Sequence, residues 1–448
     1  MSRVRFPHPL VLLVACALLA AVLTYFVPSG QYDRREDPAT GRQVVVAGTY
    51  HDVPPNPIGP FEALVAIPKG LTDAASVVFL VFLVGGAFTV VDQTGALRHG
   101  VDWLVRKLRN RQGFVIPVVS IAFAAGGALE NLQEEIIPMV PVLVILTRRF
   151  GYDIVVAAAV SIGAAVVGSA FSPINPFQVQ IAQKLAALPL LSGSFFRIAF
   201  LIPALGLWIW GTIRYARRTQ TKTIAEEYSS EDSKLGVRSA SILLLVLLTF
   251  AVFVYGVVRL GWDFDQMSAL FFLMGVLAGF LGRLGITGTA EAFVEGFRGM
   301  AFAGILIGVA RAIFYIMNEG RIVDTIVNAL FTPIADLPVL LSAFGMMVVH
   351  NLIHVPVPSV SGQAVLTMPI LVPLSDLLGL SRQITILAYQ YGAGLCEMIT
   401  PTNGALMAIL AAAGVRYENW LKFAVPLYAG LSVLGMIAIG LGIATGLK

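Results

Sequence analysis

Three carboxylates and an amide lie together in an otherwise apolar part of the chain. Glu130, Asn131, Glu134 and Glu135 occupy the polar centre of the segment 113–147, and apolar stretches flank this centre on both sides. A carboxylate in apolar surroundings is costly unless it binds a proton, a cation or a polar ligand. We expect Asn131, Glu134 and Glu135 to contact a substrate and Glu130 to take part in ion coupling. The alternative is that the acids only cap a helix, where the macrodipole favours them.

A second polar centre lies in the segment 337–378, which has the same layout. Its centre runs from Pro358 to Gln363, and we expect Ser361, Gly362 and Gln363 to contact the substrate. His350 and His354 lie just before it. For these two histidines a packing role and a proton relay both remain open.

Two further segments, 153–190 and 384–415, exceed the ~20 residues that cross a bilayer, and proline and asparagine interrupt each in the middle. They are predicted to be broken helices. A broken helix presents free N–H groups at one inner end, where anions bind, and free carbonyls at the other, where cations bind. We expect substrate contacts from residues with polar side chains at the breaks, Asn175, Thr402 and Asn403.

Ion coupling is expected at the same breaks. Candidate residues are Ser172, Glu397 and Thr400, together with Glu130. Oxygen ligands suit Na⁺, so a Na⁺ site is expected from Ser172, Asn175, Thr400 and Asn403, whereas the acidic cluster would equally serve protons. Arg311 is a candidate partner of Glu397, and a scaffold ion pair or a dimer contact is favoured for it over substrate contact.

These polar groups are set in a membrane protein. Of 448 residues, 57% are hydrophobic and 12% charged, and the mean hydropathy is +0.83, whereas a soluble domain has about 25% charged residues. The net charge of +4 is not gathered into one basic patch, which excludes nucleic-acid binding. Cys16 and Cys396 lie far apart and form no disulfide or metal-ligand pattern. Apolar runs that predict crossings lie at 10–27, 72–95, 153–190, 195–216, 241–258, 266–282, 302–319, 384–415 and 420–446.

The chain contains an internal repeat at an offset of 225–231 residues. Matching stretches are Glu62-Ala63-Leu64-Val65 with Glu291-Ala292-Phe293-Val294, Gly95 with Gly320, Pro138 with Pro369, and 172–176 with 400–404. If 113–147 and 337–378 are re-entrant hairpins, each returns to its own side, and the two copies are inverted. We therefore predict an all-α polytopic membrane protein with two inverted repeats, about nine transmembrane helices, two re-entrant hairpins and two broken helices.

Four parts follow from this arrangement. Residues 1–58 form a first transmembrane helix and an exterior loop, 59–216 the first repeat, 217–284 a cytoplasmic linker with two connecting helices, and 285–448 the second repeat. A small β-hairpin is expected between 31 and 57, with an inert loop as the alternative. Basic residues mark cytoplasmic loops and place the N-terminus in the cytoplasm and the C-terminus outside; the basic clusters are Arg98, Arg106, Lys107, Arg109 and Arg111; Arg148 and Arg149; and Arg214, Arg217, Arg218 and Lys222.

Inverted repeats with broken helices are typical of secondary transporters. An intramembrane enzyme and a channel are the alternatives. The chain has no His-Glu-x-x-His, Gly-x-Ser-x-Gly or phosphate-loop motif. A channel would use rings of like residues from an oligomer rather than an internal pair of hairpins. We expect no organic cofactor, only a coupling ion, Na⁺ or H⁺.

Short motifs along nearly the whole chain resemble one family. They are Tyr32-Asp33-Arg34, Gly48-Thr49-Tyr50-His51, Gly85-Gly86-Ala87-Phe88, Glu134-Glu135, Asn175-Pro176-Phe177, Thr367-Met368-Pro369-Ile370, Ser381-Arg382-Gln383 and Ile399-Thr400-Pro401-Thr402. With these motifs the chain resembles the YfcC branch of the anaerobic dicarboxylate carrier family, in the ion transporter superfamily. The resemblance implies an elevator-type carrier of the bacterial inner membrane, often a homodimer embedded in lipid, for dicarboxylates or basic amino acids. It differs at Ala393, where the family usually has Asp.

Charge favours one substrate class. The two hairpin centres and the two breaks contain no Lys or Arg, so a carboxylate there depends on helix N-termini and loop N–H groups. A second carboxylate would meet Glu134, Glu135 and Glu397, whereas an ammonium would pair with one of them. We therefore favour a zwitterionic or basic amino acid as substrate, with a four-carbon dicarboxylate as the alternative.

Overall fold

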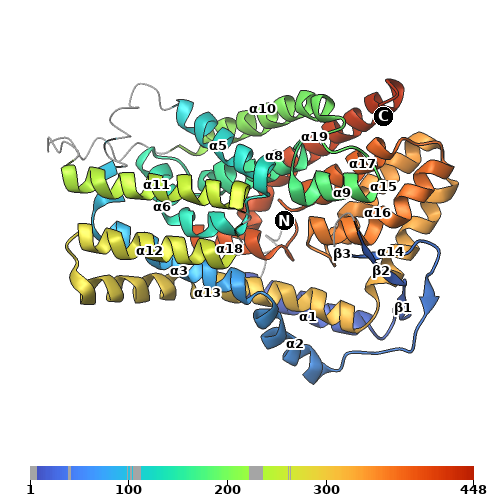
Figure 1. Ribbon diagram of the computed structural model, residues 1–448, viewed down its shortest axis with the longest axis horizontal. Coiled ribbons are helices and arrows are strands. Elements are labelled where there is room, and N and C mark those ends of the chain that lie inside the picture. Colours follow the sequence, from blue (N-terminus) through green and yellow to red (C-terminus); the bar gives the residue numbers. More distant parts are fainter. Residues whose placement is uncertain are drawn as a thin grey trace, which may run out of the picture.

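The protein is described by a computed structural model that covers residues 8–38, 42–97, 99–100, 103, 113–220, 236–260, 262 and 264–447. The basic clusters between 98 and 111, and Lys222 with most of the expected linker, lie outside the described residues. α-Helices dominate, and the longer ones run along the long axis of the molecule (Figure 1). Within the described part, the helices long and apolar enough to cross a membrane are α3 (Ala75–Gln93), α10 (Ser194–Thr219), α12 (Phe264–Leu281), α13 (Gly285–Glu319), α16 (Val360–Leu377) and α19 (Tyr417–Ala444).

The two copies of the repeat have the same order of elements. In the first, α2 (Pro60–Asp73) and α3 precede a hairpin of α5 (Val115–Glu130), η2 (Glu134–Met139) and α6 (Val140–Arg149); the broken helix comprises α7 (Val155–Ala158), η3 (Ala159–Gly163), α8 (Ala164–Ala170), η4 (Pro176–Gln180) and α9 (Ile181–Leu185), and α10 follows. In the second, α13 precedes the hairpin of α15 (Val339–His354) and α16, the broken helix of α17 (Arg382–Cys396) and α18 (Gly404–Ala413), and α19. With α1 (Pro9–Leu23) and α11 (Val237–Leu260), the described helices agree with the predicted crossings, hairpins and breaks.

Equivalent helices of the two copies run in opposite directions. The α2–α3 segment packs along α13 so that Gly70 lies against the backbone of Gly308, and Gly85 lies against Met300. Further along α3, the amide of Gln93 donates to Glu295 at 2.6 Å. Residue numbers therefore rise on α3 as they fall on α13, which is the antiparallel relation that inverted copies require.

The long helix α13 differs from its counterpart in the first copy. We expected a crossing over 302–319, but α13 is continuous from Gly285 to Glu319, 35 residues in all. In the first copy the same stretch is divided at Ala74, and α2 contains Pro68 where α13 has Phe297. The sequence analysis also missed α14 (Val323–Phe331), a short helix after α13.

The stretch after α1 forms small antiparallel strand pairs, as expected. The strand β1 (Gly30–Gln31) pairs with β4 (His51–Asp52), and β2 (Arg34–Asp37) pairs with β3 (Arg42–Val45). Asp324 of α14 accepts the backbone N–H of Tyr32 and a hydrogen from Arg34, both at 2.9 Å. Burial raises the pKa of Tyr32 to about 12, and the hydroxyl of Tyr32 donates to Oδ1 of Asn328 at 2.9 Å. These hydrogen bonds hold the strands against α14, at the end of the molecule where α19 also ends (Figure 1).

Candidate functional site

Asparagine caps the second half of each broken helix. The Oδ1 of Asn175 accepts hydrogen bonds from the backbone N–H groups of Phe177 and Gln178, both at 2.9 Å. In the second copy, Oδ1 of Asn403 accepts from the N–H of Leu406 at 3.0 Å. These side chains satisfy part of the free N–H groups that every helix start presents. The breaks are therefore closed by their own residues at the same position in both copies.

Each break is also tied to the hairpin of its own copy. Ser172 donates to the carbonyl of Ala128 at 2.7 Å, and Asn175 donates to that of Gly127 at 2.9 Å. In the second copy Thr402 donates to the carbonyl of Val355 at 2.7 Å. Since Ser172, Asn175 and Thr402 are buried, these bonds hold each hairpin against its broken helix.

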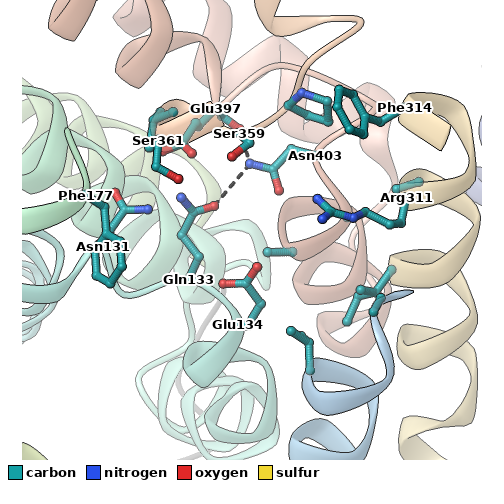
Figure 2. A pocket seen from close by; sticks show the side chains of 18 of the residues that line it. Asn131, Gln133, Glu134, Phe177, Arg311, Phe314, Ser359, Ser361, Glu397 and Asn403 are labelled. Atoms are coloured by element: carbon teal, nitrogen blue, oxygen red, sulfur yellow. Dashed lines mark hydrogen bonds between the residues drawn. The ribbon is translucent and has the colours of Figure 1, made fainter. Parts of the chain in front are cut away.

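A cavity of about 480 Å³ lies where the two hairpin tips, the second break, α13 and the α2–α3 junction meet (Figure 2). It contains most of the predicted site residues: Glu130, Asn131, Glu134, Glu135, Ser361, Glu397, Thr402 and Asn403. These predicted residues line one cavity although they are up to 273 positions apart in the chain.

Five predicted residues do not line this cavity in the described structure: Ser172, Asn175, Gly362, Gln363 and Thr400. Ser172 and Asn175 bond to α5, as described above. Gln363 lies behind the second tip and bonds to His350 and His354, and Thr400 donates to the carbonyl of Cys396.

The first break reaches the cavity only through the ring of Phe177. We expected polar groups from both hairpin tips and both breaks, but Ser172 and Asn175 donate their side-chain hydrogen bonds to carbonyls of α5. The four residues of the expected Na⁺ site consequently fall into two groups. Ser172 and Asn175 bond to the first hairpin at α5. In the second break, Thr400 donates to the carbonyl of Cys396, and Asn403 donates to Gln133 and to the carbonyl of Glu397. Within the described residues, no group of three or more His, Cys, Asp or Glu is placed to hold a metal ion.

Five polar cavity residues were missing from the predicted site: Asp73, Ser76, Gln133, Arg311 and Ser359. Gln133 accepts a hydrogen bond from Nδ2 of Asn403 at 3.1 Å. Its position between Asn131 and Glu134 in the first tip was the available signal. Asp73 and Arg311 lie outside the four loops, so the loop pattern could not indicate them.

Arg311 brings a positive charge into the cavity. It pairs with Asp73, not with Glu397 as considered from the sequence, and its side chain is about half exposed. It also attracts Glu134 across the cavity (Figure 2). The two hairpin tips and the two breaks contain no Lys or Arg, but α13 supplies one guanidinium to the cavity.

Acidic groups nonetheless dominate the cavity. The cavity is lined by one guanidinium, that of Arg311, and by five carboxyl groups. The carboxyl groups belong to Asp73, Glu130, Glu134, Glu135 and Glu397. Glu397 is 3% exposed, and its Oε2 has no hydrogen-bond partner in the described structure. A buried carboxyl oxygen without a partner is costly, so it is a natural place for a cation or a proton.

Comparison with known proteins identifies the family of this chain. The family described as "C4-dicarboxylate anaerobic carrier" (DcuC) matches residues 6–444. The chain belongs to the DcuC family. This DcuC-family chain is 31% identical over 487 aligned positions to "Putative basic amino acid antiporter YfcC" of Escherichia coli K12, covering 98% of this chain and 96% of that protein. The resemblance to the YfcC branch is confirmed.

Other similar proteins are more distant. An uncharacterized protein of Haemophilus influenzae is 28% identical, covering 97% of this chain and 96% of its own length. Among solved structures, the YdaH transporter of Alcanivorax borkumensis has a TM-score of 0.46 at 18% identity, covering 98% of this chain and 99% of its own. MtrF of Neisseria gonorrhoeae, from a class of antimetabolite efflux pumps, has a TM-score of 0.41 at 16% identity, covering 97% and 94%. These structures are too distant to place a site residue.

Membership of the DcuC family decides the class of protein. The chain is a multi-pass membrane transporter, and the intramembrane enzyme no longer applies as an alternative.

Proposed function

We propose that this DcuC-family transporter carries a small amino acid, zwitterionic or basic, across the bacterial inner membrane in exchange or uptake coupled to a cation. The observation that carries the proposal is the charge of the cavity, with five carboxyl groups against one guanidinium. A ligand that brings positive charge lowers the electrostatic cost of this arrangement, whereas a ligand with two negative charges raises it.

The cavity offers separate places for the two ends of an amino acid. An ammonium or a basic side chain would pair with Glu397 or Glu134, which line the cavity from the second break and the first hairpin tip. The carboxylate would bind Arg311 on the opposite wall, where a guanidinium can form two parallel hydrogen bonds. Asn131, Ser361, Thr402 and Asn403 would complete the polar contacts.

The similar proteins support the choice of substrate in part. The name of YfcC gives a basic amino acid antiporter, which fits the acidic cavity. The family description names C4-dicarboxylates, which are the second candidate. Arg311 favours a dicarboxylate because its guanidinium places a positive charge in the cavity that the hairpin tips and the breaks do not supply. A dicarboxylate would need most of the five acids to be protonated or paired with cations.

Movement and coupling are part of the proposal. The cavity lies between the hairpins with their broken helices and the helix α13, so a shift of the former past the latter, as in an elevator, would expose the site on alternate sides. Either H⁺ at Glu130 and Glu397 or Na⁺ near Thr400 and Asn403 would serve as the coupling ion. We further propose a homodimer in the lipid bilayer, with a cytoplasmic N-terminus and an exterior C-terminus.

Exchange in proteoliposomes tests the function. Vesicles that contain the purified protein and are loaded with unlabelled L-arginine should take up labelled L-arginine, and excess external L-lysine or L-ornithine should compete, while succinate should not. Uptake of labelled succinate that no amino acid inhibits would favour the dicarboxylate alternative and refute the proposal.

A further inference from the structure

A fully buried arginine lies near the first break. Arg197 is the fourth residue of α10 and is 0% exposed. Its guanidinium donates to Oε1 of Gln390 at 2.9 Å, to the carbonyl of Ser192 at 2.9 Å and to Oε1 of Gln383 at 3.1 Å. All three acceptors are neutral, and in the described part of the chain Arg197 forms no ion pair with a carboxylate. A buried charge of this kind is costly unless dipoles compensate it, so it calls for an explanation.

The charge of Arg197 reaches the first break through one side chain. Gln390 accepts from Arg197 with Oε1 and donates with Nε2 to the carbonyl of Ser172 at 2.8 Å. Ser172 lies two residues after the end of α8 at Ala170, where the carbonyl end of a half-helix carries partial negative charge. Arg197 therefore supplies positive charge to the place in the first copy where a broken helix attracts a cation.

The helix that follows the second break also carries a buried donor, but this donor is neutral. Trp420 is the fourth residue of α19, as Arg197 is of α10, and its Nε1 donates to the carbonyl of Met398 at 2.7 Å. The second break also contains Glu397, whose buried Oε2 lacks a partner. The first break thus has a buried guanidinium beside it, and the second has a buried carboxyl group.

We propose that Arg197 is the permanent cation of the first break, and that the exchangeable coupling cation binds only at the second break, beside Glu397. Arg197 acts as a positioning residue, because it reaches the break through Gln390 and touches neither the cavity nor a substrate. The second half of this inference rests on the proposed cation-coupled transport, whereas the first half does not depend on any substrate.

Chemical rescue of the purified, full-length protein tests the first half. Arg197→Ala should lower the Tm, and millimolar methylguanidinium should restore part of the loss, whereas methylurea, a neutral molecule of nearly the same shape, should not. Neither additive should raise the Tm of the wild type. The matched control is Arg382→Ala, which removes a guanidinium that pairs with Asp376 away from the break, and neither additive should raise its Tm either. Equal rescue by methylurea, or no rescue by either, would show that the positive charge is not what the break requires.

A second pair of variants keeps the test decisive if Arg197→Ala does not fold. A charge requirement predicts a higher Tm for Arg197→Lys than for Arg197→Gln. The reverse order would mean that hydrogen bonding alone matters, and would overturn the inference.

The coupling half is tested by L-arginine binding at increasing Na⁺ and at several pH values. The cation dependence should vanish in Glu397→Gln and persist in Arg197→Lys. Persistence in Glu397→Gln would refute the single exchangeable site. A lack of L-arginine binding by the wild type would instead count against the proposed function, and the rescue experiment would still stand.

Discussion

The Nδ2 of Asn403 donates to Oε1 of Gln133 across 3.1 Å, and this bond joins the second break to the tip of the first hairpin (Figure 2). Asn403 caps α18 with its other amide atom, and its Nδ2 also donates to the backbone carbonyl of Glu397 at 3.4 Å. One hydrogen-bond chain therefore connects the two inverted copies along the wall of the cavity. Loss of either amide would break the connection between the hairpin tip and the second break.

A double-mutant cycle measures this connection. Gln133→Leu and Asn403→Leu should each weaken L-arginine binding, and their effects should be less than additive by about 0.5–1.5 kcal/mol, the usual net value of one hydrogen bond. Isothermal titration calorimetry gives the four affinities. As a control, Gln180→Leu, which removes a bond to the carbonyl of Ile174, should combine additively with Asn403→Leu. Additivity in the first cycle would mean that the bond does not shape the site.

The buried carboxyl of Glu397 should contribute to binding of the amine. Glu397→Gln is close in size and removes the charge, so the affinity for L-arginine should fall by about 1–3 kcal/mol, the range for a hydrogen bond with a charged group. Glu295→Gln is the matched control, because Glu295 bonds to Gln93 outside the cavity. Equal affinities for Glu397→Gln and the wild type would show that Glu397 does not bind the amine.

Arg311 should recognise the carboxylate of the substrate. Arg311→Gln should weaken binding of L-arginine by about 1–3 kcal/mol and leave agmatine, which has the same guanidinium group but no carboxylate, almost unchanged. Asp73→Asn separates the two roles of Arg311, because it removes only the ion pair. If Asp73→Asn reproduces the whole effect of Arg311→Gln, the arginine is a scaffold residue.

Cysteine labelling tests the topology. In a protein with Cys16 and Cys396 replaced by serine, single cysteines at Ser230 and Lys448, both outside the described residues, should react from opposite faces. A cysteine at Thr49, in the loop that contains the strands, should react from the same face as Lys448, because this loop and the end of α19 lie at one end of the molecule (Figure 1). Labelling of Ser230 and Lys448 from one face would rule out the proposed placement of the C-terminus.

Local sequence signals predicted the hairpins and the breaks. Pro173, Asn175 and Pro176 in the first copy, and Pro401 and Asn403 in the second, interrupt long apolar runs, and both asparagines cap the following helix. The chemistry of these residues acts within a few positions, so it can be read from the sequence.

Features that depend on distant packing could not be predicted in the same way. Arg311 enters the cavity because α13 crosses beside the hairpins, and no neighbour in the sequence indicates this. Likewise, Ser172 and Asn175 were expected at the site, but their hydrogen bonds to α5, more than 40 residues away, turn them from it.

The most direct test of the proposed function is a thermal-shift screen of the purified protein, since a ligand stabilises the native state that it binds. L-Arginine, L-lysine, L-ornithine, succinate and malate should be compared in Na⁺ and in choline. We predict that at least one basic amino acid raises the Tm and that succinate and malate do not. A rise with succinate or malate, and none with any amino acid, would contradict the assignment of an amine-bearing substrate to the acidic cavity.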